Sequence, residues 1–273
     1  MLRENVYDTG EVVLNVAVGE PTGAPLLMMH GATLNWQSFE PFFEELEPRW
    51  QLFAVDFRGH GKSGHPSSGY HAVDCLRDTI ALIDKLTDRP VVAMGFSLGA
   101  SIALGLAATV PGRVRAVVSI EPGLSLREAS TESLPELYGW LTWLVETKRT
   151  VRSFDDIVMR CKRNDPNLDD AGAQLQAHWI HDTSPEVAAI ALRNELFEQY
   201  DHEGMLSRMK CPALLVRGDP ALGGCVRDCD AALVTRCAPG TMIRQVPNAG
   251  HMLLWGEPGQ QTLGHVRAFL SSL

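Results

Sequence analysis

The sequence lacks the features that mark membrane, fibrous and disordered proteins. Its longest apolar runs are far too short to span a bilayer, and it has no low-complexity tract and no internal repeat of fixed period. Only 7% of its residues are aromatic, yet 45% are hydrophobic and 21% are charged, as is typical of a soluble enzyme. A chain of 273 residues is long enough for one large α/β domain, or for a core domain that carries an insertion.

The chain also has no closely paired cysteines and no secretion signal. Its 6 cysteines form no C-x-x-C pair, and a chain of this size does not need disulfides for stability. Cys225 and Cys229 are one helical turn apart, which indicates packing rather than metal binding. The residues after Met1 lack the apolar core of a secretory signal, so we expect a cytoplasmic protein with reduced thiols.

Positive charge is scarce, with 24 Lys and Arg against 33 Asp and Glu and a formal net charge of −9. Binding to nucleic acid or to an anionic membrane surface requires a basic face, so this balance argues against both. We expect a small-molecule partner instead. The sequence contains no signal for an oligomeric state.

Short apolar runs alternate with segments of helical period, which is the pattern of a mostly parallel sheet covered by helices on both faces. One such helix is expected over residues 73–86, where apolar residues recur at spacings of three and four. The expected strands are Val12–Val18, Pro25–Met29, Trp50–Val55, Val91–Met94, Val114–Ile120, Pro212–Val216 and Met242–Val246.

The alternation breaks over residues 122–209, where no strand-like run occurs and the segment is helical and contains several tryptophans. An insertion of this length without a sheet of its own predicts a helical cap over the strand ends. Residues 1–121 and 210–273 then form the core domain. Ser184-Pro185-Glu186 predicts the start of the last cap helix, over Val187–Tyr200. The tryptophans are Trp140, Trp143 and Trp179.

The most informative motif is Gly95-Phe96-Ser97-Leu98-Gly99, which lies between an apolar run and a helix-forming segment. A strand that turns sharply into a helix strains its corner residue, and only neighbours without a Cβ let the backbones pass closely. The serine hydroxyl then stands at a helix N-terminus, where unpaired N–H groups and the helix dipole favour negative charge. Ser97 is therefore the candidate nucleophile, although the same pattern also occurs in ordinary turns.

A nucleophilic serine needs a base and a carboxylate that orients the base. His251 follows the last expected strand in a loop, and Asp219 stands at the C-terminal tip of the strand before it. We expect His251 to be the base and Asp219 to be the acid. Glu121, at the end of the strand that follows the nucleophile helix, is the alternative acid or a residue that lines the pocket.

With serine, acid and histidine in this order, the chain resembles an α/β-hydrolase from about residue 11 to its end. His30-Gly31-Ala32-Thr33 resembles the oxyanion loop of that family, and Asp56–Ser63 resembles its turn after the next strand. The resemblance implies an α/β fold with a mostly parallel eight-stranded sheet, helices on both faces and an inserted helical cap. It also implies that the N–H groups of Ala32 and Leu98 form the oxyanion hole. We expect His30 and His60 to be structural, and hydrolysis through an acyl-enzyme requires no metal or cofactor.

The activity implied by the resemblance is that of a serine hydrolase that cleaves a carboxylic ester or lactone of a small, partly apolar molecule through an acyl-enzyme. Related chains with a serine at this turn also cleave carbon–carbon bonds, amides or thioesters, or act as cofactor-free perhydrolases. Serine at position 97 argues against the haloalkane dehalogenases and epoxide hydrolases, which use aspartate there. A small-molecule receptor built on the same fold is the rival from a different class.

Three further patterns have simpler explanations. Gly61-Lys62-Ser63 ends like a phosphate-binding loop, but Asp56 stands where that loop requires glycine, so we interpret the segment as a turn. His178, His181 and Cys161 are zinc-ligand types, but polar positions on a cap helix explain the histidines and we expect no metal. The basic stretch at 148–163 is typical of a solvated helix face, and binding of a substrate carboxylate is the alternative. Its basic residues are Lys148, Arg149, Arg152, Arg160, Lys162 and Arg163.

Overall fold

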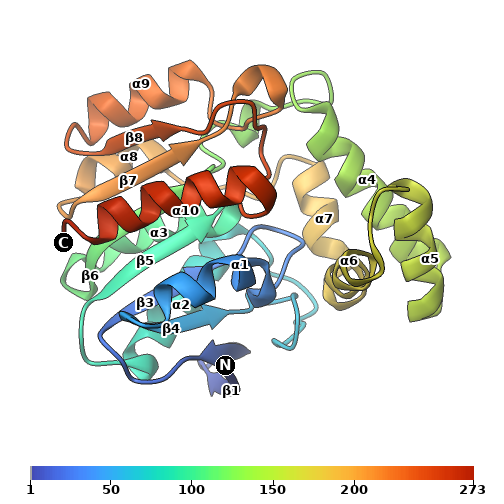
Figure 1. Cartoon of the computed structure of the whole chain (residues 1–273), viewed down its shortest axis with the longest axis horizontal. Coiled ribbons are helices and arrows are strands. Elements are labelled where there is room, and N and C mark those ends of the chain that lie inside the picture. Colours follow the sequence, from blue (N-terminus) through green and yellow to red (C-terminus); the bar gives the residue numbers. More distant parts are fainter. Residues whose placement is uncertain (1) are drawn as a thin grey trace.

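One sheet of eight strands forms the centre of the structure, a computed structural model that describes residues 2–273 apart from the side chain of residue 127 (Figure 1). The strands lie in the order β1-β2-β4-β3-β5-β6-β7-β8. β2 pairs antiparallel with β1 and with β4, and every other neighbouring pair is parallel, which confirms the expected mostly parallel sheet. The strands are β1 (Arg3–Asp8), β2 (Val13–Val18), β3 (Ala24–Met29), β4 (Trp50–Val55), β5 (Val91–Phe96), β6 (Val114–Ile120), β7 (Ala213–Arg217) and β8 (Met242–Gln245).

The central strands bring the residues that follow them to one edge of the sheet. β5 is buried along its whole length, as expected for a continuous apolar strand covered on both faces. Phe96 at the end of β5 is in register with Ile120 at the end of β6. Because the two strands are parallel, Ser97 and Glu121 leave the sheet side by side.

Helices cover both faces of the sheet, with α1 and α10 on one face and α2, α3, α8 and α9 on the other (Figure 1). α3 is apolar on all sides because it packs between the sheet, α2 and α8. No helix within residues 2–273 is long and apolar enough to cross a membrane. The bounds are α1 (Glu40–Leu46), α2 (Ala72–Leu86), α3 (Leu98–Thr109), α8 (His202–Arg208), α9 (Asp228–Cys237) and α10 (Gly256–Leu270), with short 3-10 helices η1 (Trp36–Phe39), η2 (Pro111–Arg113), η3 (Leu126–Glu128) and η4 (Pro220–Leu222).

Four helices between β6 and β7 lie to one side of the sheet and are called the inserted helices (Figure 1). They have an apolar core of their own, in which Leu144, Cys161, Ala177 and Ile180 are fully buried. α8, the last helix before β7, packs on α3 instead and is part of the sheet's helical cover. The inserted helices are α4 (Pro135–Thr150), α5 (Phe154–Asn164), α6 (Asp170–Asp182) and α7 (Pro185–Leu192).

The helix expected over Val187–Tyr200 is shorter in the structure, because α7 ends at Leu192. Asn194 and Gln199 have φ values of 59° and 61°, in the left-handed region that a right-handed helix cannot contain. Leu196, Phe197 and Tyr200 are buried in the main core, and this burial produces the apolar periodicity without a helix.

Candidate active site

Ser97 forms the corner between β5 and α3. Its φ of 53° and ψ of −112° lie outside the regions that L residues usually adopt, so its backbone is strained. A Cβ on Gly95 would lie 2.1 Å from the backbone of Gly99, and a Cβ on Gly99 would lie 2.0 Å from the carbonyl oxygen of Met29. Glycine at both positions therefore allows the turn that presents Ser97 at the N-terminus of α3.

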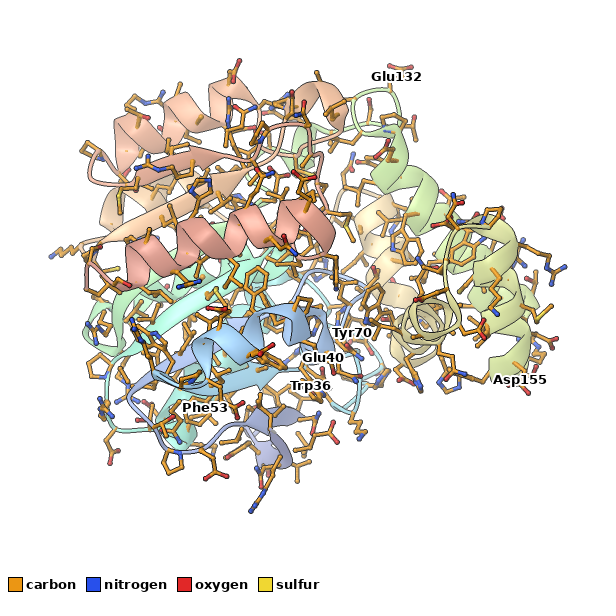
Figure 2. The ribbon with its side chains drawn as sticks, in the orientation of Figure 1. Trp36, Glu40, Phe53, Tyr70, Glu132 and Asp155 are labelled. Carbon is orange, nitrogen blue, oxygen red and sulfur yellow. The ribbon has the colours of Figure 1, made fainter. Side chains whose placement is uncertain are left out.

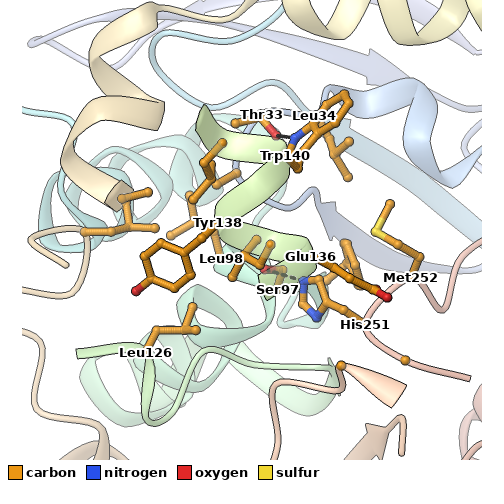
Figure 3. Close-up of a pocket in the computed structure, with 18 of the residues that line it drawn as sticks. Thr33, Leu34, Ser97, Leu98, Leu126, Glu136, Tyr138, Trp140, His251 and Met252 are labelled. Atoms are coloured by element: carbon orange, nitrogen blue, oxygen red, sulfur yellow. Dashed lines mark hydrogen bonds between the residues drawn. The ribbon is translucent and has the colours of Figure 1, made fainter. Parts of the chain in front are cut away.

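A chain of hydrogen bonds joins Ser97, His251 and Glu121, and Figure 3 shows the contact between the first two. Nε2 of His251 lies 3.2 Å from Oγ of Ser97, and Nδ1 lies 3.0 Å from Oε2 of Glu121. The His251 side chain is 13% exposed and that of Glu121 is completely buried. This arrangement allows the imidazole to take a proton from the hydroxyl while the carboxylate fixes the Nδ1–H tautomer.

Backbone donors hold the Glu121 carboxylate in this position. Its Oε1 accepts the N–H of Gly218 at 2.7 Å, and its Oε2 accepts the N–H of Cys225 at 2.6 Å. The residue itself has a φ of 53°, and its N–H donates to the carbonyl of Val216 on the neighbouring strand. Hydrogen bonds of this kind fix the position of the carboxylate beside His251.

Asp219 does not contact His251, which corrects the expectation that it orients the imidazole. Its side chain accepts the N–H of Ala221 at 2.9 Å and so caps the 3-10 helix that begins at Pro220. Its own N–H donates to the carbonyl of Ala249. The alternative acid, Glu121, lies against His251 instead.

The surroundings of His251 favour its protonated form. Burial lowers the pKa of His251, whereas the sulfur of Cys225 and the carboxylate of Glu121 raise it, and the net direction is upward. An imidazolium that forms when His251 accepts a proton is therefore stabilised on the Nδ1 side of the ring.

Two backbone N–H groups lie beside Ser97 without an acceptor of their own. In the described part of the chain, neither the N–H of Ala32 nor that of Leu98 donates a hydrogen bond, and both residues line the cavity at Ser97. Leu98 is the first residue of α3, where N–H groups have no partner within the helix. The two groups are able to donate to an oxyanion formed at a substrate carbonyl.

Two buried histidines hold the loop that contains Ala32. Nε2 of His30 accepts the N–H of Phe57 at 3.0 Å, and Nε2 of His60 accepts the N–H of Thr33 at 3.1 Å. Both rings are almost completely buried and lie edge to face, with centroids 4.8 Å apart. Their contacts join the loop after β3 to the turn after β4.

The Ser97 hydroxyl opens into a cavity of about 400 Å³ between the sheet edge and the inserted helices. Tyr138, Trp140 and Trp179 line it from α4 and α6, and Figure 3 shows Trp140 above Ser97 and Tyr138 to its left. Nε1 of Trp140 donates to Oγ1 of Thr33 at 3.0 Å, which fastens α4 to the loop that contains Ala32. The third tryptophan of the insertion, Trp143, lies outside this cavity, on a separate surface groove.

The model of the alpha/beta hydrolase fold family matches residues 24–258, which is most of the chain. The chain belongs to the α/β-hydrolase family. A 2-(acetamidomethylene)succinate hydrolase from Mesorhizobium japonicum is 29% identical to this α/β-hydrolase over 254 residues, which cover 89% of this chain and 87% of the relative. An N-formylmaleamate deformylase from Pseudomonas putida is 27% identical, over 86% of this chain and 84% of the relative. A crystal structure of E-2-(acetamidomethylene)succinate hydrolase matches with a TM-score of 0.78 at 27% identity, covering 99% of this chain and 100% of that one.

One group of side chains in this α/β-hydrolase has the composition of a metal site. Glu121, Cys225 and His251 have ligand atoms within 4.8 Å of one another, and no other such group occurs among the described residues. The three residue types all bind zinc. Here the carboxylate already accepts two backbone N–H groups and the imidazole already lies against Ser97, which suits proton transfer. The sequence indicated only packing for Cys225, because its place beside His251 depends on the loop between β7 and α9.

The other residues singled out in the sequence lie away from Ser97. The carboxylate of Asp56 accepts the N–H groups of Trp36 at 2.8 Å and Lys62 at 3.1 Å, which closes residues 56–63 into a turn. His178 on α6 packs against Phe154, with ring centroids 4.6 Å apart. Part of the basic stretch lines the separate groove beside Trp143. Its arginines there are Arg152, Arg160 and Arg163.

The buried histidines predict that this hydrolase loses stability in mild acid. Burial lowers the pKa of His60 to about 4, so between pH 6.5 and pH 4 the unfolded chain binds this proton and the folded chain does not. Stability therefore falls as the pH falls through this window, by up to about 3 kcal/mol for His60 alone. The pKa of His30 is lowered in the same direction, whereas burial raises the pKa of Asp56 to about 6 and opposes part of the loss.

Urea unfolding at pH 7.5 and pH 5 measures this effect. We expect the His60→Gln variant to be less stable than the wild type at pH 7.5, because the contact with Thr33 is altered, but to lose less stability on acidification. His178→Gln is the matched control, since His178 is exposed. Equal pH dependence in the wild type and in His60→Gln would show that His60 is not responsible.

Proposed function

We propose that the chain is a serine hydrolase that cleaves a carboxylic ester or lactone of a small, partly apolar molecule through an acyl-enzyme. The observation that carries this proposal is the chain of contacts from Glu121 through His251 to Ser97 at a strained strand-to-helix turn. Family membership supports the hydrolytic activity, and the geometry supports Ser97 as its nucleophile.

In the proposed mechanism, His251 takes the Ser97 proton while Oγ attacks the substrate carbonyl carbon. The N–H groups of Ala32 and Leu98 donate to the oxyanion. His251 then passes its proton to the departing alcohol oxygen, which leaves an acyl group on Ser97. A water molecule, deprotonated by the same histidine, attacks the acyl carbon. His251 then returns this proton to Oγ of Ser97 as the acyl–oxygen bond breaks and the acid leaves. Glu121 holds Nδ1–H throughout and stabilises the imidazolium.

We further propose that the inserted helices are a cap that selects the substrate, with residues 1–121 and 210–273 as the core and 122–209 as the capping segment. Trp140 and Trp179 support this role, because both line the cavity and both donate hydrogen bonds to the loop after β3. α8 packs on α3, so the part of the segment that covers the site ends before His202.

A fluorophosphonate probe followed by peptide mass mapping tests the proposal. We expect one adduct, on Ser97, because attack on the phosphorus requires an activated hydroxyl beside oxyanion donors. Heat-denatured protein is the control and should not react. An adduct on another residue, or no adduct on the folded protein, would contradict the proposal.

An amide of the same kind of molecule is the second candidate. The names of two relatives, a hydrolase of an acetamidomethylene compound and an N-formylmaleamate deformylase, favour it. The steps are the same except that His251 protonates an amine rather than an alcohol. Matched ester and amide substrates with one acyl group distinguish the two by their kcat/KM values.

A further inference from the structure

Among the side chains that the structure describes, the cavity beside Ser97 contains no cationic one other than His251, whose two ring nitrogens already contact Glu121 and Ser97. Its walls are mainly aliphatic and aromatic, with Phe96, Trp140 and Trp179 among the largest side chains. Within the described residues, no lysine and no arginine lines it. A carboxylate that enters such a cavity loses its hydration without gaining a lysine or arginine partner from these residues.

Glu136, an acidic residue that lines the cavity, makes the site still less favourable for a substrate carboxylate. Glu136 lies in the first turn of α4, at the exposed margin of the cavity (Figure 3). Its carboxylate faces Gly223 on the other side, with Oε2 3.3 Å from the point that a Cβ on Gly223 would occupy. No hydrogen bond or ion pair engages the Glu136 side chain among residues 2–273. A substrate that enters the cavity therefore passes a carboxylate that no lysine or arginine of the described residues pairs with.

The basic residues of α4 and α5 do not compensate for it, because none of those that the structure describes lines the cavity. Nζ of Lys148 donates to the carbonyl of His181 at 2.6 Å, and Lys162 pairs with Asp170. Arg160 donates to Thr150 at 3.0 Å on the separate groove. The alternative that the basic stretch binds a substrate carboxylate at Ser97 consequently has no support in this geometry.

We propose that the site accepts an uncharged, apolar acyl group and rejects acyl groups that end in a carboxylate, with Glu136 as the specificity-determining residue. The proposal rests on the proposed function and narrows its substrate class. The proposed substrate differs in charge from that of the relative from Mesorhizobium japonicum, whose name specifies a succinate, which is a dicarboxylate. Each methylene group buried in the cavity should raise kcat/KM about fourfold until the cavity is filled.

Two methyl esters of equal length test the proposal, methyl hexanoate and monomethyl adipate, which differ only in a terminal methyl or carboxylate group. We expect the wild type to prefer methyl hexanoate by about 100-fold or more in kcat/KM. Glu136→Gln should reduce this preference several-fold, and Glu136→Lys should reduce it further because it places a cation at the margin. Glu132→Gln and Glu132→Lys are the matched controls. Glu132 lies in the exposed turn before α4 and does not line the cavity (Figure 2).

Equal rates on the two esters, or a preference for the adipate, would overturn the proposal. Equal effects of the substitutions at positions 132 and 136 would show that Glu136 does not determine the specificity. Calorimetric titration of both esters into Ser97→Ala separates this proposal from the proposed function. If the wild type hydrolyses neither ester while Ser97→Ala binds methyl hexanoate more tightly, the catalytic proposal fails and the charge selectivity stands. If Ser97→Ala binds the adipate equally well or better, the charge selectivity fails whatever the activity.

Discussion

The Ser97→Ala variant is expected to lose ester hydrolysis almost completely, with kcat reduced by about 10⁵-fold to 10⁶-fold. The alanine lacks the oxygen that forms the acyl-enzyme, and no other hydroxyl among the described residues contacts His251. Binding is expected to persist, because the walls of the cavity and the N–H groups of Ala32 and Leu98 are unchanged. The activity that remains should come from the oxyanion donors and from substrate binding alone.

Initial rates on methyl hexanoate, measured with the fluorophosphonate reaction on the same preparation, test this result. Ser207→Ala is the matched control, because Ser207 is exposed on α8 and donates only to the carbonyl of Glu203. Thermal unfolding should give similar midpoints for both variants and the wild type. A Ser97→Ala protein that keeps more than about one per cent of the wild-type kcat would show that another residue is the nucleophile.

The strained turn at Ser97 could be predicted from the sequence because it requires glycine on both sides of the serine. A Cβ on Gly95 would meet the backbone of Gly99, and a Cβ on Gly99 would meet the backbone of Met29, so both requirements are visible as glycines within five consecutive residues. The central strands were predictable for a similar reason, since burial on both faces demands an uninterrupted apolar run. β1 was missed because it is an edge strand whose residues are mostly exposed, so no apolar pattern marks it.

Which carboxylate lies against His251 could not be predicted in this way, because two carboxylates follow neighbouring parallel strands. Glu121 follows β6 and Asp219 follows β7, and both strands end at the same edge of the sheet. Which carboxylate reaches His251 depends on loop conformation. Pro220 directs Asp219 into a 3-10 helix that uses its side chain as a cap, while the donors for Glu121 come from residues about a hundred positions later. Sequence spacing does not encode that long-range arrangement.

The second large effect is expected from Glu121→Gln, with kcat/KM reduced by about 10³-fold to 10⁴-fold, while Asp219→Asn changes it by no more than about threefold. Glutamine fills nearly the same volume but removes the negative charge that stabilises the imidazolium. The two oxygens of Glu121 accept the N–H groups of Gly218 and Cys225, so the NH2 end of glutamine would face one of these donors without being able to accept from it. Asparagine at 219 disturbs only the cap of a short helix.

The pH dependence of kcat/KM shows whether the Glu121→Gln variant loses activity because the pKa of His251 changes or because the structure is disturbed. Because Glu121 helps to raise the pKa of His251, removing its charge should move the acidic limb of the profile to lower pH, whereas Asp219→Asn should leave the limb in place. His251→Ala provides the reference for loss of the base and should abolish that limb. If Asp219→Asn lost the larger factor and moved the limb, the active enzyme would use Asp219 as its acid, and the loop after β7 would have to rearrange to bring it to His251.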